Sequence, residues 1–312
     1  MSDDRFVSIA VCPACNCPKR ELLGDLPGRS YELGRAIVPF PEGGIPLYRC
    51  EQCGLIYKGL LPSKQFLAEV VASEARFYWL NDETFDGIAP ELASLVGENY
   101  DLIDVGAWSG GLLAACAGAG GRRSALDIVE HPDIAGALRG EFVHGFIEDQ
   151  NLAWSENPYD VVTLFDVLEH LYEPNRAFAN IRRFLRPGGV ALVETGNSVI
   201  GDRLKDGPTS WWYIRLFEHH MVWNAQSIRA AAERHGLVLE RLDRVRHKAH
   251  GDALTARAWR LFRAGLCWNG QRVWRSKIGL YRLQRETRGV EEADHLRVVL
   301  RQPDCGRDRG MS

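Results

Sequence analysis

The residues best suited to do chemistry form a glycine-rich turn followed by an acid at a fixed distance. Residues 100–113 read as an apolar strand that runs into a turn containing Gly106, Gly110 and Gly111. Glycine allows a tight turn and lets the backbone approach a ligand closely. Asp127 lies 21 residues beyond Gly106, at the end of the next short strand. A carboxylate there can accept hydrogen bonds from two ribose hydroxyls, so the pattern predicts a site for a cofactor that contains a nucleoside.

Two classes of cofactor use this geometry. Dinucleotides need G-x-G-x-x-G, with the pyrophosphate at the N-terminus of the helix. Here Gly106 is followed by Ala107, Trp108 and Ser109, so the second glycine is missing. The bulky Trp108 would hinder the approach of the backbone to a diphosphate. S-adenosylmethionine carries no phosphate, and the turn therefore favours it over NAD.

The elements that must position this turn alternate between strand and helix. Apolar strands are expected after the turn within 142–149, within 159–170 and at 190–195, with helices before, between and after them. Such alternation predicts an α/β domain built on a doubly wound, mostly parallel sheet. Ligands of these sheets bind at the carboxyl ends of the strands. The residues expected at those ends are Gly106, Asp127, Asp149, Asp166 and Thr195.

Two sequence motifs give this domain a family resemblance. The pattern hydrophobic-Asp-Val-Gly-x-x-Ser-Gly at 103–110 resembles the first motif of class I S-adenosylmethionine-dependent methyltransferases. The run Phe-Asp-Val-Leu-Glu-His-Leu at 165–171, with Leu-Arg-Pro-Gly-Gly at 185–189, is similar to a later motif of their small-molecule members. The resemblance covers roughly residues 75–245 and implies a seven-stranded sheet. It implies cofactor contacts from Asp104, Gly106, Ala107, Ser109, Gly110, Asp127, Ile128, Glu148, Phe165 and Asp166.

Four cysteines near the N-terminus form two C-x-x-C pairs. Cys12 and Cys15 make the first pair, Cys50 and Cys53 make the second, and 34 residues lie between the pairs. Each pair can direct two thiolates at one ion, and four thiolates suit tetrahedral Zn²⁺. Because all four positions are filled by protein, the predicted zinc is structural. Cys17 is a spare thiol that could complicate the ligand set.

The acceptor side of the site is expected in a segment rich in aromatic residues, 211–224. It contains three tryptophans and a tyrosine, and Glu218, His219 and His220 are candidate proton acceptors in it. A packed lid without chemistry is the alternative. His170 is either a helix N-terminal residue or a further catalytic group.

This segment also resembles that of bacterial zinc-ribbon methyltransferases, some of which C-methylate deoxysugar nucleotides. The resemblance implies that His219 is the base that such chemistry needs. Leu216 stands where those enzymes carry a tyrosine, and their large second C-terminal domain is missing here. The predicted acceptor is therefore a small molecule, such as a sugar nucleotide, a glycan or a secondary metabolite. RNA or protein methylation and a non-catalytic scaffold stay open as alternatives.

Composition and charge set the remaining bounds. Of 312 residues, 46% are apolar, which suffices for a packed core, and the net charge of −3 gives no overall preference for nucleic acid. Residues 241–312 nevertheless carry 17 Lys and Arg against 8 Asp and Glu. A helical cap, a peripheral membrane contact and a nucleic-acid contact would each explain this basic tail. No secretion signal or transmembrane run is evident, which predicts a cytoplasmic protein.

The expected organisation has three parts. They are a zinc ribbon (1–62), a methyltransferase domain that binds S-adenosylmethionine (63–245) and a basic helical C-terminal extension with a disordered end (246–312).

Overall fold

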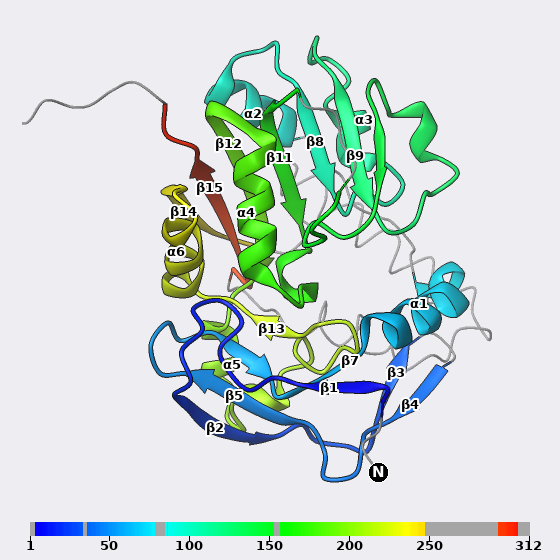
Figure 1. The fold of residues 1–312 in the computed structure, drawn as a ribbon, viewed down its shortest axis with the longest axis vertical. Coiled ribbons are helices and arrows are strands. Elements are labelled where there is room, and N and C mark those ends of the chain that lie inside the picture. Colours follow the sequence, from blue (N-terminus) through cyan, green and yellow to red (C-terminus); the bar gives the residue numbers. More distant parts are fainter. Residues whose placement is uncertain are drawn as a thin grey trace, which may run out of the picture.

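A seven-stranded sheet forms the centre of the computed structural model, which describes residues 4–33, 36–78, 85, 87–152, 157–246 and 293–304. The strand order is β10-β9-β8-β11-β12-β15-β14. The first five strands are parallel, and β15 runs antiparallel to both of its neighbours (Figure 1). In chain order the strands are β8 (Leu102–Val105), β9 (Arg123–Asp127), β10 (Phe142–His144), β11 (Tyr159–Phe165), β12 (Leu185–Gly196), β14 (Val238–Val245) and β15 (His295–Arg301).

Helices cover both faces of this sheet. Every residue of β8 is buried, as expected for a strand with helices on both sides. Leu102 packs into the core on the side of α2 (Ile88–Val96) and α3 (Gly111–Ala115). Ile103 packs into the core formed with α4 (Pro174–Phe184) and α6 (Ala225–Arg234). The pleat of the strand thus divides its apolar side chains between two cores.

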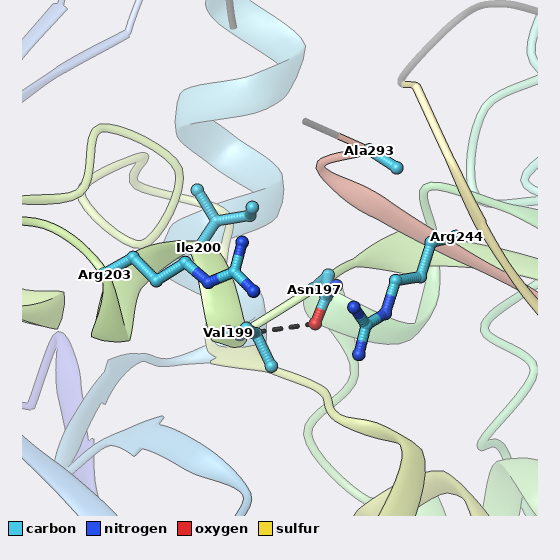
Figure 2. Close-up of a pocket in the computed structure, with 6 residues that line it drawn as sticks. All are labelled: Asn197, Val199, Ile200, Arg203, Arg244 and Ala293. Carbon is cyan, nitrogen blue, oxygen red and sulfur yellow. Dashed lines mark hydrogen bonds between the residues drawn. The ribbon is translucent and has the colours of Figure 1, made fainter. Parts of the chain in front are cut away.

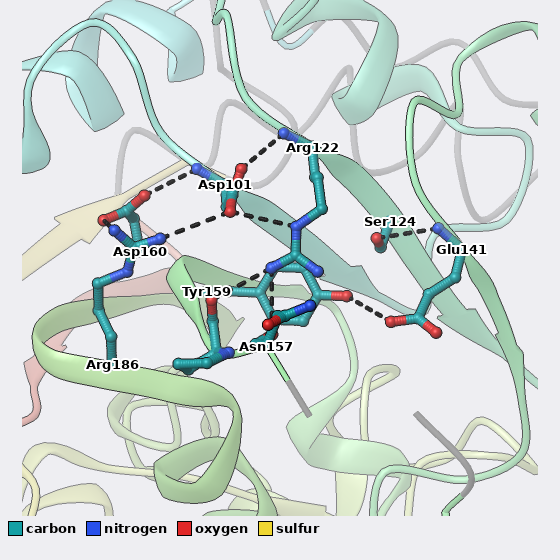
Figure 3. Close-up of polar contacts among 9 residues, drawn as sticks. Asp101, Arg122, Ser124, Glu141, Asn157, Tyr159, Asp160 and Arg186 are labelled. Carbon is teal, nitrogen blue, oxygen red and sulfur yellow. Dashed lines mark hydrogen bonds and ion pairs between the residues drawn. The ribbon is translucent and has the colours of Figure 1, made fainter. Parts of the chain in front are cut away.

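Polar contacts fix the edge of the sheet at which the parallel strands begin. The carboxylate of Asp101 accepts hydrogen bonds from the backbone N–H of Arg122, at 2.7 Å, and from its side-chain Nε, at 3.1 Å. Arg186 forms an ion pair with Asp160 at 2.9 Å (Figure 3). These residues lie at the starts of four neighbouring strands. Their contacts stabilise the edge of the sheet opposite the carboxyl ends, and ligands of such sheets bind at the carboxyl ends.

The N-terminal part forms smaller sheets below the carboxyl edge (Figure 1). The main one has the order β13-β6-β5-β2, and β13 comes from far along the chain. The elements of this region are β1 (Phe6–Ser8), β2 (Arg20–Asp25), β3 (Ser30–Leu33), β4 (Ala36–Pro39), β5 (Pro46–Cys50), β6 (Ile56–Lys58), β7 (Leu60–Pro62), α1 (Lys64–Tyr78) and β13 (Met221–Val222). The cysteine-bearing ribbon is therefore completed by a strand that belongs to the aromatic segment 211–224.

Short elements make up the connections. They are the 3₁₀ turns η1 (Ile134–Gly136), η2 (Leu168–His170) and η3 (Pro208–Ser210), and the helical turn α5 (Val199–Asp202). The helix expected after Asp127 is reduced to η1, because Pro132, Gly136 and Gly140 interrupt the segment. That prediction was wrong.

The C-terminal region differs from the expected extension. Residues 295–301 form β15 between β12 and the edge strand β14, where Val298, Val299 and Leu300 are fully buried. A continuous apolar run buries both faces of such a strand, which places the end of the domain beyond residue 245. Residues 247–292 and 305–312 lie outside the described residues, and with them the predicted basic helices and disordered end. Among the described helices, none is long and apolar enough to cross a membrane.

Candidate active site

The glycine turn after β8 has the geometry that its sequence predicts. Gly106 and Gly110 adopt positive φ values of 72° and 80°. A Cβ at Gly106 would lie 2.6 Å from Cγ2 of Val167, and one at Gly110 would lie 2.9 Å from Cβ of Ala137. Any larger residue at either position would clash, so both glycines are required by packing as well as by conformation.

Two carboxylates, Asp104 and Asp127, lie next to this turn, and Asp127 hydrogen-bonds to it. Asp104 is buried, and its carboxylate accepts a hydrogen bond from the hydroxyl of Thr163 at 2.7 Å. The two oxygens of Asp127 accept the backbone N–H groups of Trp108, at 2.9 Å, and Val129, at 3.0 Å. Burial raises the pKa of Asp127, although these N–H groups oppose the rise. A carboxylate has about four lone-pair sites, so Asp127 can still accept hydrogen bonds from two hydroxyls.

Trp108 does not extend toward β11. Its backbone is left-handed, with φ 47°, and its ring packs against His131 with the centroids 4.7 Å apart. His131 follows β9, whereas Phe165 and Asp166 end β11, and these two strands flank β8 on opposite sides. The ring therefore lies on the side of the turn away from Phe165 and Asp166.

The end of β11 carries a second strained residue. Asp166 has φ 54°, a left-handed conformation that is uncommon for residues other than glycine and that concentrates at functional sites. Its Oδ1 lies 3.4 Å from Nε2 of His295, the first residue of β15. Burial lowers the pKa of His295, but Asp166 and Asp294 outweigh it and raise the pKa to about 10. A protonated His295 thus holds the Asp166 carboxylate at the site. Sequence reasoning missed His295, because nothing in the sequence indicated that its segment joins the sheet.

His219 lies at the centre of a buried polar network. Its ring packs against Tyr213, with centroids 4.1 Å apart, and against His170, at 4.8 Å. Burial, then the neighbouring charge of His170, lowers the pKa of His219 well below its ordinary value. The imidazole is therefore neutral near pH 7 and can accept a proton. Its Nδ1 has no hydrogen-bond partner among the described residues.

Glu169 supports this network from the sheet side. It is fully buried and accepts hydrogen bonds from Tyr213 and, at 2.8 Å, from Thr195. The Tyr213 hydroxyl in turn accepts the backbone N–H of Gly196 at 3.0 Å. Ligand atoms of Glu169, His170 and His219 all lie within 4.8 Å of one another. Because both Glu169 oxygens already accept hydroxyl hydrogen bonds, we interpret the trio as a hydrogen-bonded network rather than as a metal centre.

Glu218 and His220 have other neighbours than His219 has. Glu218 is buried near Lys58 of β6, and burial raises its pKa to about 7, opposed by Lys58. Burial lowers the pKa of Lys58 to about 7, opposed in turn by Glu218. His220 is fully buried, and its ring packs against that of Tyr172 with the centroids 4.3 Å apart. Of the three candidate proton acceptors, His219 is the one best placed at the carboxyl edge.

Glu148 was predicted to contact the cofactor, and the structure gives its carboxylate a different role. The residue is 1% exposed, and its Oε2 accepts the backbone N–H groups of Tyr172, at 2.9 Å, and Glu173, at 2.8 Å. Its Oε1 forms an ion pair with Lys64 at 2.7 Å. These contacts fix the start of α4 against α1, and the predicted contact of Glu148 with the cofactor stays a prediction.

The four predicted metal-binding cysteines converge. Their sulfur atoms lie within 4.8 Å of one another, with Cys12–Cys53 at 3.6 Å and Cys15–Cys50 at 3.4 Å. A disulfide would need about 2 Å, whereas tetrahedral Zn–S bonds of about 2.3 Å place sulfurs ~3.8 Å apart. All four residues are buried, while Cys17 is partly exposed and lies outside the cluster. The cluster suits a four-thiolate Zn²⁺ site.

Comparisons with known proteins agree with this geometry. The profile of the family described as "Methyltransferase domain" matches residues 77–242. Ubiquinone biosynthesis O-methyltransferase of Actinobacillus pleuropneumoniae is 27% identical over 132 residues, which are 39% of this chain and 55% of that protein. The enzyme of the same name from Maricaulis maris is 28% identical over 108 residues, 32% of this chain and 42% of that protein. The chain thus spans about half the length of the curated relatives that it matches.

A solved structure shows the same fold. Phosphoethanolamine N-methyltransferase 2 of Haemonchus contortus, in complex with S-adenosyl-L-methionine, superimposes with a TM-score of 0.54 at 14% identity, over 80% of this chain and 63% of that one. The family match covers more than half of the chain and includes the glycine turn, Asp127 and Asp166. On these grounds the chain belongs to the methyltransferase domain family and has the class I S-adenosylmethionine-dependent methyltransferase fold.

Proposed function

We propose that the protein transfers a methyl group from S-adenosylmethionine to a small-molecule acceptor, with His219 as the general base. The observation that carries this proposal is that the glycine turn, Asp127 and the His219 network lie at the same edge of the sheet. The glycine turn and Asp127 lie at the carboxyl ends of β8 and β9, and the His219 network lies beside the carboxyl end of β12. This common edge, where such folds bind ligands, supports a methyl donor and a base that lie along it.

Residues at this edge would each have a separate role in holding the cofactor. Asp127 would accept the ribose hydroxyls, Gly106, Ala107, Ser109 and Gly110 would form the floor, and Ile128 would flank the adenosine side. Phe165 and Asp166 would border the methionine end. When bound, S-adenosylmethionine supplies a methyl group already activated by its sulfonium. The protein then needs to align the acceptor, exclude water and remove a proton.

His219 fits the proton-removing role because it is neutral and has an unpaired ring nitrogen. The acceptor that it deprotonates is either a carbon acid beside a carbonyl, as in sugar C-methylation, or a hydroxyl. The curated relatives are ubiquinone biosynthesis O-methyltransferases, and they favour a hydroxyl. The zinc-ribbon resemblance favours the sugar. Assays with both acceptor classes, with S-adenosylhomocysteine production as the readout, discriminate between them.

Zinc would serve the site indirectly. The cysteine cluster lies in the same apolar core as Leu164 and Trp223 of the methyltransferase part. The ribbon strand β6 also pairs with β13, which begins one residue after His220. We therefore propose that Zn²⁺ bound by Cys12, Cys15, Cys50 and Cys53 is structural and stabilises the wall that carries His219. A folded protein that binds S-adenosylhomocysteine but turns over no acceptor would favour the scaffold alternative.

A further inference from the structure

A buried lysine of the ribbon contacts the segment that carries His219. This residue, Lys58 in β6, has no exposed surface. Its ammonium donates a hydrogen bond to the carbonyl oxygen of Leu216 at 2.6 Å, and its backbone N–H donates to the carbonyl oxygen of His220 at 2.9 Å. The ribbon strand thus binds this segment three residues before His219 and again one residue after it.

The carbonyl group of Leu216 joins Lys58 to the proposed base. The same oxygen accepts the backbone N–H of His219 at 3.3 Å, so two donors share one acceptor. One of these donors belongs to the residue that bears the imidazole. On the next residue, the backbone N–H of His220 donates to the carbonyl oxygen of Glu169 at 2.7 Å. The backbone on both sides of the imidazole is therefore held, and the ammonium of Lys58 supplies one of these contacts.

The charge of Lys58 is costly for folding alone. Burial lowers the pKa of Lys58 to about 7, and the carboxylate of Glu218 opposes this shift. The ring of Tyr31 offers a second partner, since its centroid lies 4.6 Å from Nζ of the lysine. An apolar side chain of similar length could fill the same space without desolvating a charge. Buried ionisable groups of this kind concentrate at functional sites, which directs attention to His219.

The position of Lys58 also affects the protonation of His219. Burial, then the charges of His170 and Lys58, lower the pKa of His219, and Asp166 opposes them. Lys58, with a pKa of about 7, is charged below pH 6.5, where His219 would otherwise take up a proton. A positive charge there disfavours the imidazolium and favours the neutral base. The titratable groups around His219 are Glu169 and His170 from η2, Tyr213 from its own segment, Lys58 from β6, Asp166 from the end of β11 and His295 from β15.

The far end of the aromatic segment is attached to the sheet without Lys58. Asn197, which follows β12, forms a β-bridge with Trp223. The side-chain oxygen of Asn197 accepts the backbone N–H of Val199 at 3.3 Å (Figure 2). A substitution of Lys58 should therefore act on the backbone near His219 and leave this attachment intact.

We propose that Lys58 is a positioning residue for methyl transfer, whose ammonium fixes the Leu216 carbonyl group that orients His219 and places a positive charge near this base. This inference rests on the proposed function. It adds a residue from the ribbon, outside the region 77–242 that matches the family profile. Lys58 does not touch the reacting atoms and acts through His219.

The first test is a double-mutant cycle between Lys58→Met and His219→Gln in the full-length, zinc-loaded protein. Methionine keeps a similar length and removes both the donor and the charge. In the wild-type background, Lys58→Met should lower kcat about tenfold or more, because a misplaced catalytic group costs rate. Affinity for S-adenosylhomocysteine should stay within about twofold. In the His219→Gln background, Lys58→Met should cost no further rate, because the group that it positions is gone.

A second test needs no acceptor. NMR of the histidine rings follows protonation as a function of pH, and the signals of His219 are identified by their loss in His219→Gln. Lys58→Met should raise the pKa of His219 by about half a unit or more. Lys19→Met removes an exposed lysine of the ribbon and should leave this pKa and kcat unchanged. Circular dichroism and zinc content verify folding, and Lys58→Gln, which stays polar, replaces Lys58→Met if that variant does not fold.

The outcomes separate this inference from the proposed function. Equal losses of kcat from Lys58→Met with and without His219, or an unchanged pKa of His219, would overturn the inference and leave Lys58 a structural residue. Absence of turnover by the wild type, with a His219 pKa that still responds to Lys58→Met, would instead count against the proposed function.

Discussion

The ammonium group of Lys58, in ribbon strand β6, donates a hydrogen bond to the carbonyl oxygen of Leu216 at 2.6 Å. Leu216 lies three residues before His219, so a side chain of the ribbon holds the segment that carries the proposed base. Lys58 is fully buried, and its ammonium also lies 4.6 Å from the centroid of the Tyr31 ring. The ribbon therefore contacts the segment that carries the proposed base.

This relationship predicts that zinc loss impairs turnover more than cofactor binding. Cys53→Ser should remove the metal, lower the melting temperature and reduce kcat roughly tenfold or more, because the ribbon needs its metal to fold. Affinity for S-adenosylhomocysteine should change less, since Asp127 ends β9 of the seven-stranded sheet, whereas β13 belongs to the sheet of the ribbon. Metal content, thermal unfolding and calorimetry measure the three effects. Cys17→Ser, a thiol outside the cluster, is the matched control, and full turnover by metal-free Cys53→Ser would refute the prediction.

His219→Gln should lower kcat by about 10²- to 10⁴-fold, the usual contribution of a general base. Affinity for S-adenosylhomocysteine should stay the same, because His219 is assigned to the acceptor. Steady-state kinetics gives kcat, and calorimetry on the same preparation gives the affinity for S-adenosylhomocysteine. His220→Gln tests the assignment, since a kcat loss confined to that variant would move the role to His220.

The pH dependence of the wild-type rate follows from the lowered pKa of His219. His219 must be neutral to act as a base, and because its pKa lies well below 6.5 it stays neutral at pH 6.5 and above. The acidic limb of kcat/KM should therefore lie below pH 6.5, with no loss between pH 7.5 and 6.5. A fall in rate centred at or above pH 6.5 that disappears in His219→Gln would contradict the buried environment described here.

Trp108→Gly should leave affinity for S-adenosylhomocysteine within about twofold of wild type. The ring packs on His131, away from Phe165 and Asp166, and glycine adopts the left-handed backbone at this position at no steric cost. Calorimetry gives the comparison. A gain of tenfold or more would mean that the indole obstructs the cofactor pocket.

The parallel part of the sheet and its ligand edge could be predicted from the sequence because each depends on local signals. Buried strands such as 159–165 read as continuous apolar runs. Gly106 and Asp127 are 21 residues apart, a spacing typical of a glycine turn followed by a ribose-binding acid. The two C-x-x-C pairs likewise identified the buried cysteine cluster. These features depend on short segments whose chemistry determines their conformation.

Features that depend on distant pairing could not be predicted in this way. β15 joins the sheet after a long separation, and neither His295 nor its contact with Asp166 has a local signal. Lys58 resembles any surface lysine until β6 pairs with β13. Tyr213 lay inside the aromatic segment, yet only the fold brings it against His219 and Glu169. The contacts of the Glu148 carboxylate with the backbone N–H groups of Tyr172 and Glu173 likewise have no local signal in the sequence.

Asp127→Ala should weaken the binding of S-adenosylhomocysteine at least tenfold, because it removes the charged group proposed to accept hydrogen bonds from two ribose hydroxyls. Each such hydrogen bond is worth roughly 1.5–3 kcal/mol. The exposed Asp133, whose side chain is 80% accessible, provides the matched control as Asp133→Ala. An unchanged affinity in folded Asp127→Ala would exclude Asp127 from the ribose site.

The most direct test of the account is calorimetric titration of the wild-type, zinc-loaded protein with S-adenosylhomocysteine and, separately, with NAD. The account predicts a dissociation constant of about micromolar order for S-adenosylhomocysteine, near −8 kcal/mol, and no binding of NAD. Absence of S-adenosylhomocysteine binding by the folded protein, or binding of NAD in its place, would contradict the assignment of this edge as the site of a methyl donor.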